Sequence, residues 1–284
     1  MNKKFGSIYL MGGFGNQIFQ LSFAKSLENE NLKVYIDKSN YLLKNKRINT
    51  AAENREIILP IENFGFSDVP SYLNLIFFIN NKLRKYSFKN YKFLPIGRYN
   101  DKNFNKSFKK YNQFVGYWQD INLIYENKDF LISKLSNNQT IAKSFSKRPK
   151  IGSTMLHVRR KDYLNMKEEL NIDYYKIAID NASQKIENFN FDVFTDDKEW
   201  VLQNDLFSNA KKINSLSSSI DDTIITFSKM LEYENYIISN STFSLIPAIL
   251  SRSEEKAVYV PTPWFRNSKK LINFPENWIG IENI

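Results

Sequence analysis

The chain has 284 residues, of which 42% are hydrophobic and 15% aromatic, enough for one large domain or two smaller ones with packed cores. It contains no cysteine, which excludes a disulfide scaffold, an iron–sulfur cluster and a cysteine-ligated zinc. Its one histidine excludes metal sites built on several imidazoles. Because we find neither a secretory signal nor a run of 18 apolar residues, we expect a cytoplasmic protein without a membrane-spanning helix.

Charge is unevenly distributed along the chain, whose formal net charge is +10. Residues 1–149 hold 24 basic and 11 acidic side chains (+13), whereas residues 150–284 hold 16 basic and 19 acidic ones (−3). Such asymmetry indicates two domains with different partners. The polar, proline-containing segment 144–150 is the predicted linker, which gives a basic domain at 1–148 and a second domain at 149–284.

The densest basic stretch runs from Lys82 to Lys110 and has ten cations against one acid, Asp101. It follows the apolar segment 72–79, which is too short to cross a bilayer. An apolar segment followed by clustered Lys and Arg is typical of a dock for an anionic membrane surface. A core helix followed by a solvated loop explains the pattern equally well. The first alternative predicts peripheral attachment to the inner face of the membrane.

Hydrophobic periodicity predicts alternating strands and helices. In the first half, a strand at 5–11 stops at two glycines, a helix follows over 18–27, and a second strand covers 32–36, whereas 40–115 gives no boundaries. In the second half, strands are predicted at 154–158, 191–194, 236–238 and 257–260, with helices at 175–186, 224–231 and 241–250. Repeated β–α pairs imply parallel sheets covered on both faces. The predicted fold class is therefore α/β, with two Rossmann-like domains facing each other across a cleft.

A glycine-rich motif, Gly12-Gly13-Phe14-Gly15-Asn16-Gln17, separates the first predicted strand from its helix. Free backbone amides and the helix dipole favour an anion at this position. The motif lacks the third glycine of a dinucleotide fingerprint and the Gly-Lys-Ser/Thr ending of a P-loop. It is therefore a cradle for a phosphate or sugar, or simply a tight turn.

A second motif, His157-Val158-Arg159-Arg160-Lys161-Asp162-Tyr163, places three consecutive cations at the end of a strand. Guanidinium forks suit a diphosphate, and Asp162 is spaced to orient one of them. An Arg–Asp pair in a solvated loop is the simpler alternative. His157 is either a general base or a buried hydrogen-bonding residue.

Two further motifs follow later strands, Thr195-Asp196-Asp197 and Asn240-Ser241-Thr242-Phe243-Ser244. The latter offers hydroxyls and helix amides to a phosphate and an aromatic ring to a base, although an ordinary Ser/Thr helix cap would look the same. The D-x-D pair with which many nucleotide-sugar transferases hold a metal is absent from the sequence. Arginines and helix N-termini would then supply the positive potential.

Taken in order, GGFGNQIFQ, GYWQD, HVRRKDY, FTDD and SNSTFS resemble the bacterial α-1,2-fucosyltransferases of glycosyltransferase family 11. The resemblance covers about Gly12 to Trp264. It implies a GT-B architecture and a metal-independent, inverting transfer of L-fucose from GDP-fucose to the 2-hydroxyl of a galactoside in a bacterial surface glycan, such as an O-antigen or capsule. A GDP-sugar transferase with another deoxyhexose or linkage is the nearest alternative. A basic nucleic-acid or membrane-surface binding protein without catalysis is the alternative of a different class.

The resemblance also implies roles for particular residues. The domain at 149–284 would bind the donor, and the domain at 1–148 would face an oligosaccharide or lipid-linked acceptor; no nucleic acid and no cofactor are expected. Donor-binding residues would be Arg159 and Arg160 on the diphosphate, Asn240, Ser241, Thr242 and Phe243 on phosphate and guanine, Asp196 near the nucleoside, and Gly13, Gly15 and Asn16 beside the reacting sugar. Arg159, Asp162, His157 and Asn16 are the candidate catalytic residues, with Asp162 and His157 as alternative bases. Trp118 and Asp120 are placed on the acceptor side, with Trp118 in the core as the alternative.

Overall fold

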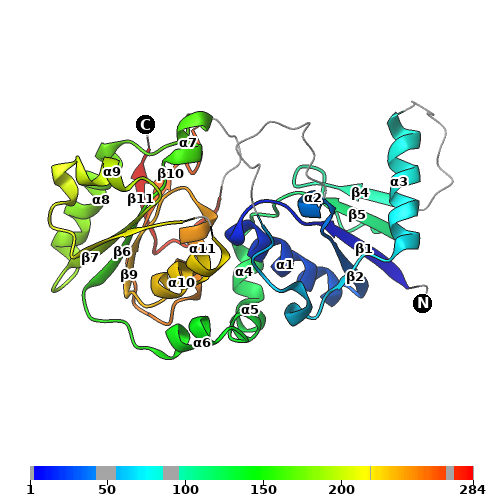
Figure 1. Ribbon diagram of the computed structural model, residues 1–284, viewed down its shortest axis with the longest axis horizontal. Coiled ribbons are helices and arrows are strands. Elements are labelled where there is room, and N and C mark those ends of the chain that lie inside the picture. The colour runs from blue at the N-terminus through cyan, green and yellow to red at the C-terminus, as the bar shows by residue number, and fades with distance from the viewer. Residues whose placement is uncertain (1–2, 43–55, 86–95, 218, 267–271, 284) are drawn as a thin grey trace. The chain divides into compact units, whose positions relative to one another are not determined.

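The computed structural model describes residues 3–42, 56–85, 96–217, 219–266 and 272–283 and shows two parallel sheets, each flanked by helices (Figure 1). Residues Met1–Gln119 form one compact unit and Asp120–Ile284 the other. The division precedes the predicted boundary at 148/149, because two helices before that boundary pack within the second unit. These are α4 (Ile121–Glu126), which contacts α11 (Thr242–Leu250), and α6 (Gln139–Ser146), which contacts α10 (Ile220–Met230).

The sheet of the first unit has the strand order β3-β2-β1-β5-β4, and all neighbouring strands are parallel. Its strands are β1 (Lys4–Tyr9), β2 (Leu32–Asp37), β3 (Ser67–Asp68), β4 (Ile96–Tyr99) and β5 (Tyr111–Val115). Its helices are α1 (Phe14–Asn29), α2 (Ser39–Leu42), the 3-10 helix η1 (Ile61–Phe64) and α3 (Ser71–Lys85). The direction of winding reverses between β1 and β5, so the loops after these two strands meet at the carboxyl edge of the sheet.

Helices α1 and α3 cover opposite faces of this sheet. Successive side chains of a strand point to opposite faces, which divides the sheet's apolar residues into two sets. On one face, Phe23 of α1 packs against Phe114 with ring centroids 5.5 Å apart. On the other, Leu73 and Phe77 of α3 are buried against Tyr35. The first unit is therefore a three-layer α/β structure with two apolar interfaces.

The sheet of the second unit has the order β11-β10-β9-β6-β7-β8 and is also wholly parallel. Its strands are β6 (Ser153–Val158), β7 (Asn190–Thr195), β8 (Lys212–Ser215), β9 (Asn235–Ile237), β10 (Val258–Thr262) and β11 (Ile279–Glu282). The other helices of this unit are α5 (Lys128–Leu135), α7 (Lys161–Met166), α8 (Ile172–Lys185), α9 (Lys198–Leu202) and the 3-10 helix η2 (Asp205–Phe207). Counted from β6, the order is the 3-2-1-4-5-6 arrangement of doubly wound nucleotide-binding sheets, which reverses between β6 and β9.

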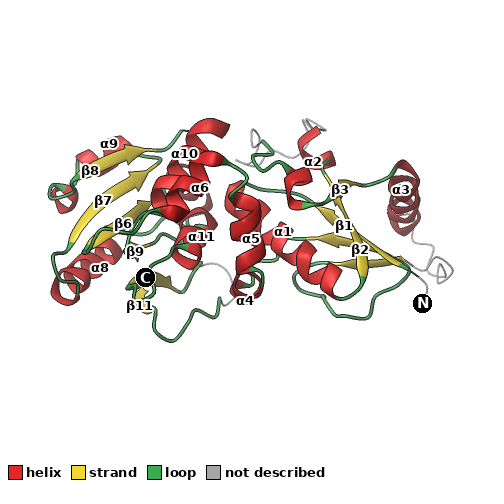
Figure 2. Cartoon of the chain, turned by 90° about the horizontal axis from the view of Figure 1, so that it is seen from below, coloured by secondary structure: helices red, strands yellow, loops and turns green. Residues whose placement is uncertain are grey.

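Helices lie on both faces of the second sheet as well, with α8 on one side and α10 and α11 on the other (Figure 2). Tyr174 and Ala178 of α8 share a buried cluster with Leu156 of β6. The adjacent strand residue, His157, points to the opposite face, where its ring lies 6.2 Å from that of Phe243 in α11. Burial on both faces explains why β6 contains no exposed residue and reads as a continuous apolar run.

The structure confirms the predicted α/β class with two parallel sheets. The predicted strands and helices of both halves are present with small changes at their ends, whereas β3, β4, β5, β8 and β11 were not predicted. Helix α3 (Ser71–Lys85) contains the segment 72–79, for which a core helix was one of the two alternatives. The predicted linker is partly helical, because 144–146 form the end of α6. That the two units face each other across a cleft stays a prediction, as do their acceptor and donor roles. Over the described parts of the chain, no helix is long and apolar enough to cross a membrane.

Candidate functional site

The predicted motifs lie at the carboxyl edges of the two sheets, and all but FTDD, at the end of β7, lie at the points where the winding reverses. In the second unit, HVRRKDY follows β6 and SNSTFS follows β9, its neighbour across the reversal. In the first unit, GGFGNQ follows β1 and GYWQD follows β5 in the same relation. Open α/β sheets bind ligands in the crevice at such positions. The topology therefore brings together, within each unit, two motifs far apart in the sequence.

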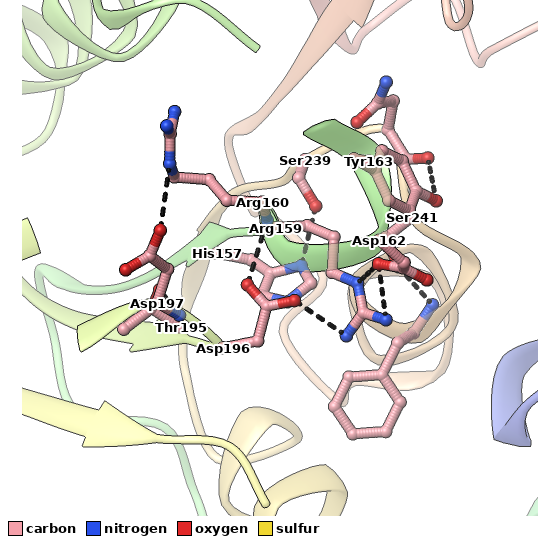
Figure 3. Close-up of polar contacts among 12 residues, drawn as sticks. His157, Arg159, Arg160, Asp162, Tyr163, Thr195, Asp196, Asp197, Ser239 and Ser241 are labelled. Atoms are coloured by element: carbon pink, nitrogen blue, oxygen red, sulfur yellow. Dashed lines mark hydrogen bonds and ion pairs between the residues drawn. The ribbon is translucent and has the colours of Figure 1, made fainter. Parts of the chain in front are cut away.

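Arg159 leaves the end of β6 and lies between two carboxylates (Figure 3). Its Nε and Nη2 atoms are each 2.8 Å from Oδ1 of Asp162, and its Nη1 atom is 3.2 Å from Oδ2 of Asp196. Burial alone would lower the pKa of Arg159, but the two carboxylates outweigh burial and raise it. The side chain keeps 26% of its surface exposed. The guanidinium is thus permanently charged, held in one orientation and still accessible to a ligand.

Asp196 connects the ends of β6 and β7. It is only 7% exposed, and its Oδ1 accepts a hydrogen bond of 2.9 Å from the backbone N–H of Arg160. Burial raises the pKa of Asp196, while the charge of Arg159 and the backbone hydrogen bond act in the opposite direction. The positive charge of Arg159 therefore compensates the buried negative charge of Asp196, and the ion pair holds both side chains in one orientation.

Arg160 points away from Arg159 (Figure 3). Its Nε atom lies 3.2 Å from Oδ2 of Asp197, and its guanidinium carbon lies 4.1 Å from the ring centroid of Trp200. Asp197 also caps α9 by accepting a hydrogen bond from the backbone N–H of Trp200. The two arginines therefore belong to different clusters, and joint contact with one diphosphate stays a prediction for Arg160.

His157 is fully buried beneath the site. Its Nδ1 atom lies 2.7 Å from the hydroxyl of Ser239, which joins β6 to the segment after β9. Burial, reinforced by the charge of Arg159, lowers the pKa of His157 to about 3. The ring is therefore neutral near pH 7 and shielded from solvent, which favours the predicted alternative of a buried hydrogen-bonding residue over that of a base.

The segment after β9 is tied down by its neighbours. The backbone carbonyl of Asn240 accepts a hydrogen bond of 3.0 Å from the hydroxyl of Tyr163, and its side-chain amide donates to the carbonyl of Glu168 at 2.7 Å. Ser241 is the N-cap of α11 and accepts a hydrogen bond from the backbone N–H of Phe243. The helix-cap alternative for Ser241 is thus confirmed, while contacts of 240–243 with a nucleotide stay predictions.

A network of neutral amides occupies the corresponding place in the first unit. The side-chain amide of Gln119 donates a hydrogen bond of 2.8 Å to Oδ1 of Asn16. Gln20 holds both loops at once, because its side chain exchanges hydrogen bonds with the backbone of Met11 (3.0 and 3.1 Å) and donates to the carbonyl of Gly116 (3.1 Å). This arrangement presents hydrogen-bonding groups without net charge.

The three glycines of the first motif serve different purposes. Gly12 has a φ of +80°, and a Cβ atom there would lie 2.7 Å from the side-chain nitrogen of Asn16, so only glycine fits. Gly13 is the N-cap of α1 and offers no capping side chain, and Gly15 is buried within the first turn of that helix. The carbonyl of Gly12 is also approached by the side chain of Gln17 at 3.3 Å.

The two predicted acceptor residues have structural contacts of their own. Trp118 is 5% exposed and stacks on Phe23 with ring centroids 4.0 Å apart and an interplanar angle of 10°. Asp120 is the N-cap of α4, since its side chain accepts a hydrogen bond from the backbone N–H of Asn122. The burial of Trp118 favours the predicted alternative of a core residue, and acceptor contact by either residue stays a prediction.

The roles of several residues that shape the two sites were not predicted. Gln17 and Gln20 belong to a predicted motif and lie three residues apart on α1. Both are fully buried, so each side chain needs hydrogen-bonding partners within the protein. Asp101 accepts hydrogen bonds from the backbone N–H groups of Tyr117 (3.0 Å) and Trp118 (2.7 Å). Its only sequence signal was its isolation among ten cations.

The described residues include no group of three or more His, Cys, Asp or Glu side chains that could hold a metal ion. Metal independence of the reaction stays a prediction.

Comparison with known proteins defines the class. The profile of glycosyl transferase family 11 matches residues 2–282, so the chain belongs to this family. It is 30% identical over 292 aligned positions to the alpha-1,2-colitosyltransferase of Escherichia coli, covering 96% of this chain and 97% of the relative. The fucosyltransferase NodZ from Bradyrhizobium is a similar solved structure, with a TM-score of 0.44 and 16% identity over 88% of this chain and 93% of that one. NodZ alpha-1,6-fucosyltransferase soaked with GDP-fucose gives a TM-score of 0.44 and 14% identity over the same shares.

Proposed function

We propose that this family 11 glycosyltransferase moves L-fucose, or a closely related deoxyhexose, from a GDP-sugar to the 2-hydroxyl of a galactoside in a bacterial surface glycan. The observation that carries the proposal is Arg159, fixed by Asp162 and Asp196 at the sheet reversal where nucleotides bind. The alpha-1,2-colitosyltransferase of E. coli supports a deoxyhexose donor and an α-1,2 linkage, because it aligns over nearly the whole chain.

Arg159 supplies the charge that the leaving nucleotide requires. In an inverting displacement the acceptor oxygen bonds to the anomeric carbon on the face opposite the nucleotide and loses its proton. The bond from the anomeric carbon to the β-phosphate oxygen breaks, and its electron pair stays on the phosphate. Negative charge on that oxygen grows toward the transition state, so a guanidinium held in advance stabilises the transition state more than the bound substrate.

The carboxylates around Arg159 leave capacity for a phosphate. A guanidinium has five N–H donors, and the contacts to Asp162 and Asp196 need three, one from each nitrogen. Two donors on the Nη atoms are then available to phosphate oxygens. The two carboxylates fix the plane of the guanidinium before the donor sugar binds. A guanidinium that is already oriented stabilises the developing negative charge without having to reorganise during the reaction.

Strong base assistance is not a requirement of this proposal. His157 is buried and neutral, so we assign it a positioning role through its contact with Ser239. Asp162 remains the candidate base, although its Oδ1 already accepts from Arg159. A reaction in which the bond to the nucleotide breaks well ahead of attack has an oxocarbenium-like transition state and needs little proton removal early on.

The amides of the first unit suit the sugar side of the reaction. Asn16 and Gln119 are linked by a hydrogen bond and carry no charge, which matches a polyhydroxylated, neutral ligand better than a phosphate. We infer that Asn16 approaches the transferred sugar and that Gln119 fixes its side-chain amide.

The test is transfer by the purified chain in EDTA, with GDP-fucose or GDP-colitose and galactose-terminated oligosaccharides. Mass spectrometry would detect the added deoxyhexose, and NMR would give the linkage and anomeric configuration. We expect substitution at the 2-hydroxyl with inversion. Arg252→Ala removes an exposed arginine of the second unit and is the matched control for substitutions of Arg159. It should leave activity intact. Transfer only from UDP- or CMP-sugars would refute the proposed donor.

A further inference from the structure

Helix α3 has apolar side chains on both of its long faces. One face, with Leu73 and Phe77, is buried against the sheet of the first unit. The other face exposes large apolar residues, namely Tyr72 (52%), Leu75 (57%), Phe78 (55%) and Ile79 (42%). Within the described parts of the chain, no other helix or strand exposes more than two large hydrophobic residues.

These four residues form a single stripe. Positions 72, 75 and 79 follow the i, i+3, i+7 spacing of one helix face, and 78 lies beside 75. A helix that packs on a sheet normally turns polar residues to solvent, so a second, exposed apolar stripe on the same helix is unusual.

Two cations lie beside the cluster on which α3 packs. The Nζ atom of Lys33 lies 5.2 Å from the ring centroid of Tyr35, and that of Lys110 lies 5.4 Å from the ring centroid of Tyr111. Both rings belong to the cluster on which α3 packs. Tyr35, and to a smaller extent Tyr72 of the stripe, raise the pKa of Lys33 above its ordinary value. The last turns of α3 carry Lys82, Arg84 and Lys85 in sequence; Lys89 and Lys92 lie outside the described residues.

Acidic residues do little to offset these charges. Asp68, three residues before α3, lies 2.8 Å from the ammonium of Lys38, which also binds Glu62 at 2.7 Å. The unit Met1–Gln119 holds 19 basic and 8 acidic residues, a net charge of +11, whereas Asp120–Ile284 holds 21 and 22, a net charge of −1. The exposed stripe thus lies on the strongly basic unit.

We propose that the exposed stripe of α3 is a docking surface for an anionic lipid bilayer. A partly inserted helix with an apolar face and neighbouring Lys and Arg is the arrangement that binds at the interface of such membranes. With 15 residues, α3 is too short to cross the bilayer and would lie in its plane. Tyr72 and the flanking lysines are side chains that place an apolar part in lipid and a polar end in water.

The cluster on which α3 packs extends to the ends of the strands opposite the proposed sugar loops. Three residues in or against the cluster under α3 are the first or second residues of their strands, namely Phe5, Ile96 and Tyr111. The loops with Gly12 and Gly116 follow the carboxyl ends of β1 and β5. The cluster under α3 therefore reaches the amino ends of these strands, whereas the proposed sugar-binding amides follow their carboxyl ends.

The experiment is co-sedimentation of the full chain with vesicles of phosphatidylcholine alone or mixed with phosphatidylglycerol. We expect binding to the anionic vesicles only, and binding that weakens steeply with salt, since surface attraction extends over a Debye length of about 8 Å at physiological ionic strength. Replacing the stripe by Leu75→Gln with Phe78→Gln should lower partitioning at least tenfold, because two large side chains no longer enter lipid. Lys33→Gln with Lys110→Gln should lower it by roughly an order of magnitude.

Matched controls come from the second unit. Ile177→Gln with Leu202→Gln replaces apolar residues of similar exposure, 45% and 62%, and Lys176→Gln with Lys211→Gln removes two exposed cations. Both controls should bind vesicles like the unchanged protein. Absence of vesicle binding, or equal binding to neutral and anionic vesicles, would overturn the proposal. So would loss of a dimer in the Leu75→Gln, Phe78→Gln protein without any vesicle binding, because the stripe would then be a protein interface. Vesicle binding is measured without substrates, so its outcome is independent of the proposed transfer.

Discussion

The two sheet reversals have the same topology and opposite chemistry. Between β6 and β9 the polar groups are ionic, with Arg159 held by Asp162 and Asp196. Between β1 and β5 they are neutral, with Asn16 and Gln119 joined through their amides. Strand order decides where a ligand can bind in such folds, but the side chains decide what it is. This difference underlies the proposed assignment of the anionic leaving group to the first site and of the neutral sugar to the second.

The two sites also differ in what holds them together. Arg159 is oriented by charge, whereas the loop after β5 is positioned by packing and by backbone hydrogen bonds to Asp101. Trp118 has a φ of +54°, a conformation unusual for a large side chain, and is kept in it by its stack on Phe23 and by Asp101. Substitutions should therefore affect catalysis at one site and stability at the other.

The largest effect is expected from Trp118→Ala, which removes a buried indole from the first unit. We expect a loss of about 3–5 kcal/mol in the free energy of unfolding, measured by urea denaturation. Trp118→Phe, which keeps an aromatic ring against Phe23, should lose much less. A stable Trp118→Ala protein with a raised KM for the acceptor alone would instead support direct contact with the acceptor sugar.

The next largest effect is expected from Arg159→Ala, which should lower kcat roughly 10²–10³-fold, or about 3–4 kcal/mol in the activation free energy. Arg159→Lys should rescue little, because an ammonium cannot reproduce the fork that meets both carboxylates. Arg160→Ala should cost less, since its guanidinium lies on Trp200. Steady-state kinetics with Arg252→Ala as control would check this, and equal losses for Arg159→Ala and Arg160→Ala would show that both contact the donor.

A smaller effect concerns pH and His157. Its pKa in the folded chain is about 3, below the ordinary value of 6.5, so the unfolded chain binds more protons between these limits. Stability from this residue is complete above pH 6.5 and is lost as the pH falls toward 3, by about 2 kcal/mol between pH 6.5 and 5. His157→Asn should show a shallower decline in its free energy of unfolding over that range. Identical slopes for the two proteins would contradict a buried, neutral imidazole.

Much of the second unit could be predicted from the sequence because its central strands are buried on both faces and read as apolar runs. The strands β8 and β11 lie at the edges of the sheet and have mostly exposed or partly exposed residues, so they gave no such run. For segment 72–79 the sequence left a core helix and a membrane dock as alternatives, because α3 is apolar on both faces and lacks the single stripe that marks helical periodicity.

The site was predictable where it depends on local spacing. The pair Arg159–Asp162 follows from three residues of separation at the start of a helix. The contact with Asp196 depends on the register of β6 and β7, in which Val158 pairs with Thr195 and brings the following residues side by side. Two parallel strands are joined by a long crossover connection, so no local sequence pattern shows which of their residues pair. Residue type alone likewise does not distinguish a buried Trp118 from one that contacts a sugar.

The smallest effect is expected from Asp101, whose carboxylate is exposed but accepts two backbone hydrogen bonds from the loop after β5. Asp101→Ala should lower the free energy of unfolding by only about 1 kcal/mol, because solvent replaces part of what is lost. The loop also carries Gln119, which holds Asn16, so KM for the acceptor or the donor sugar should rise more than kcat falls. Asp101→Asn keeps one carbonyl oxygen as acceptor and should restore part of that KM. If both variants changed stability but left both KM values unchanged, Asp101 would support the fold without positioning the amide pair.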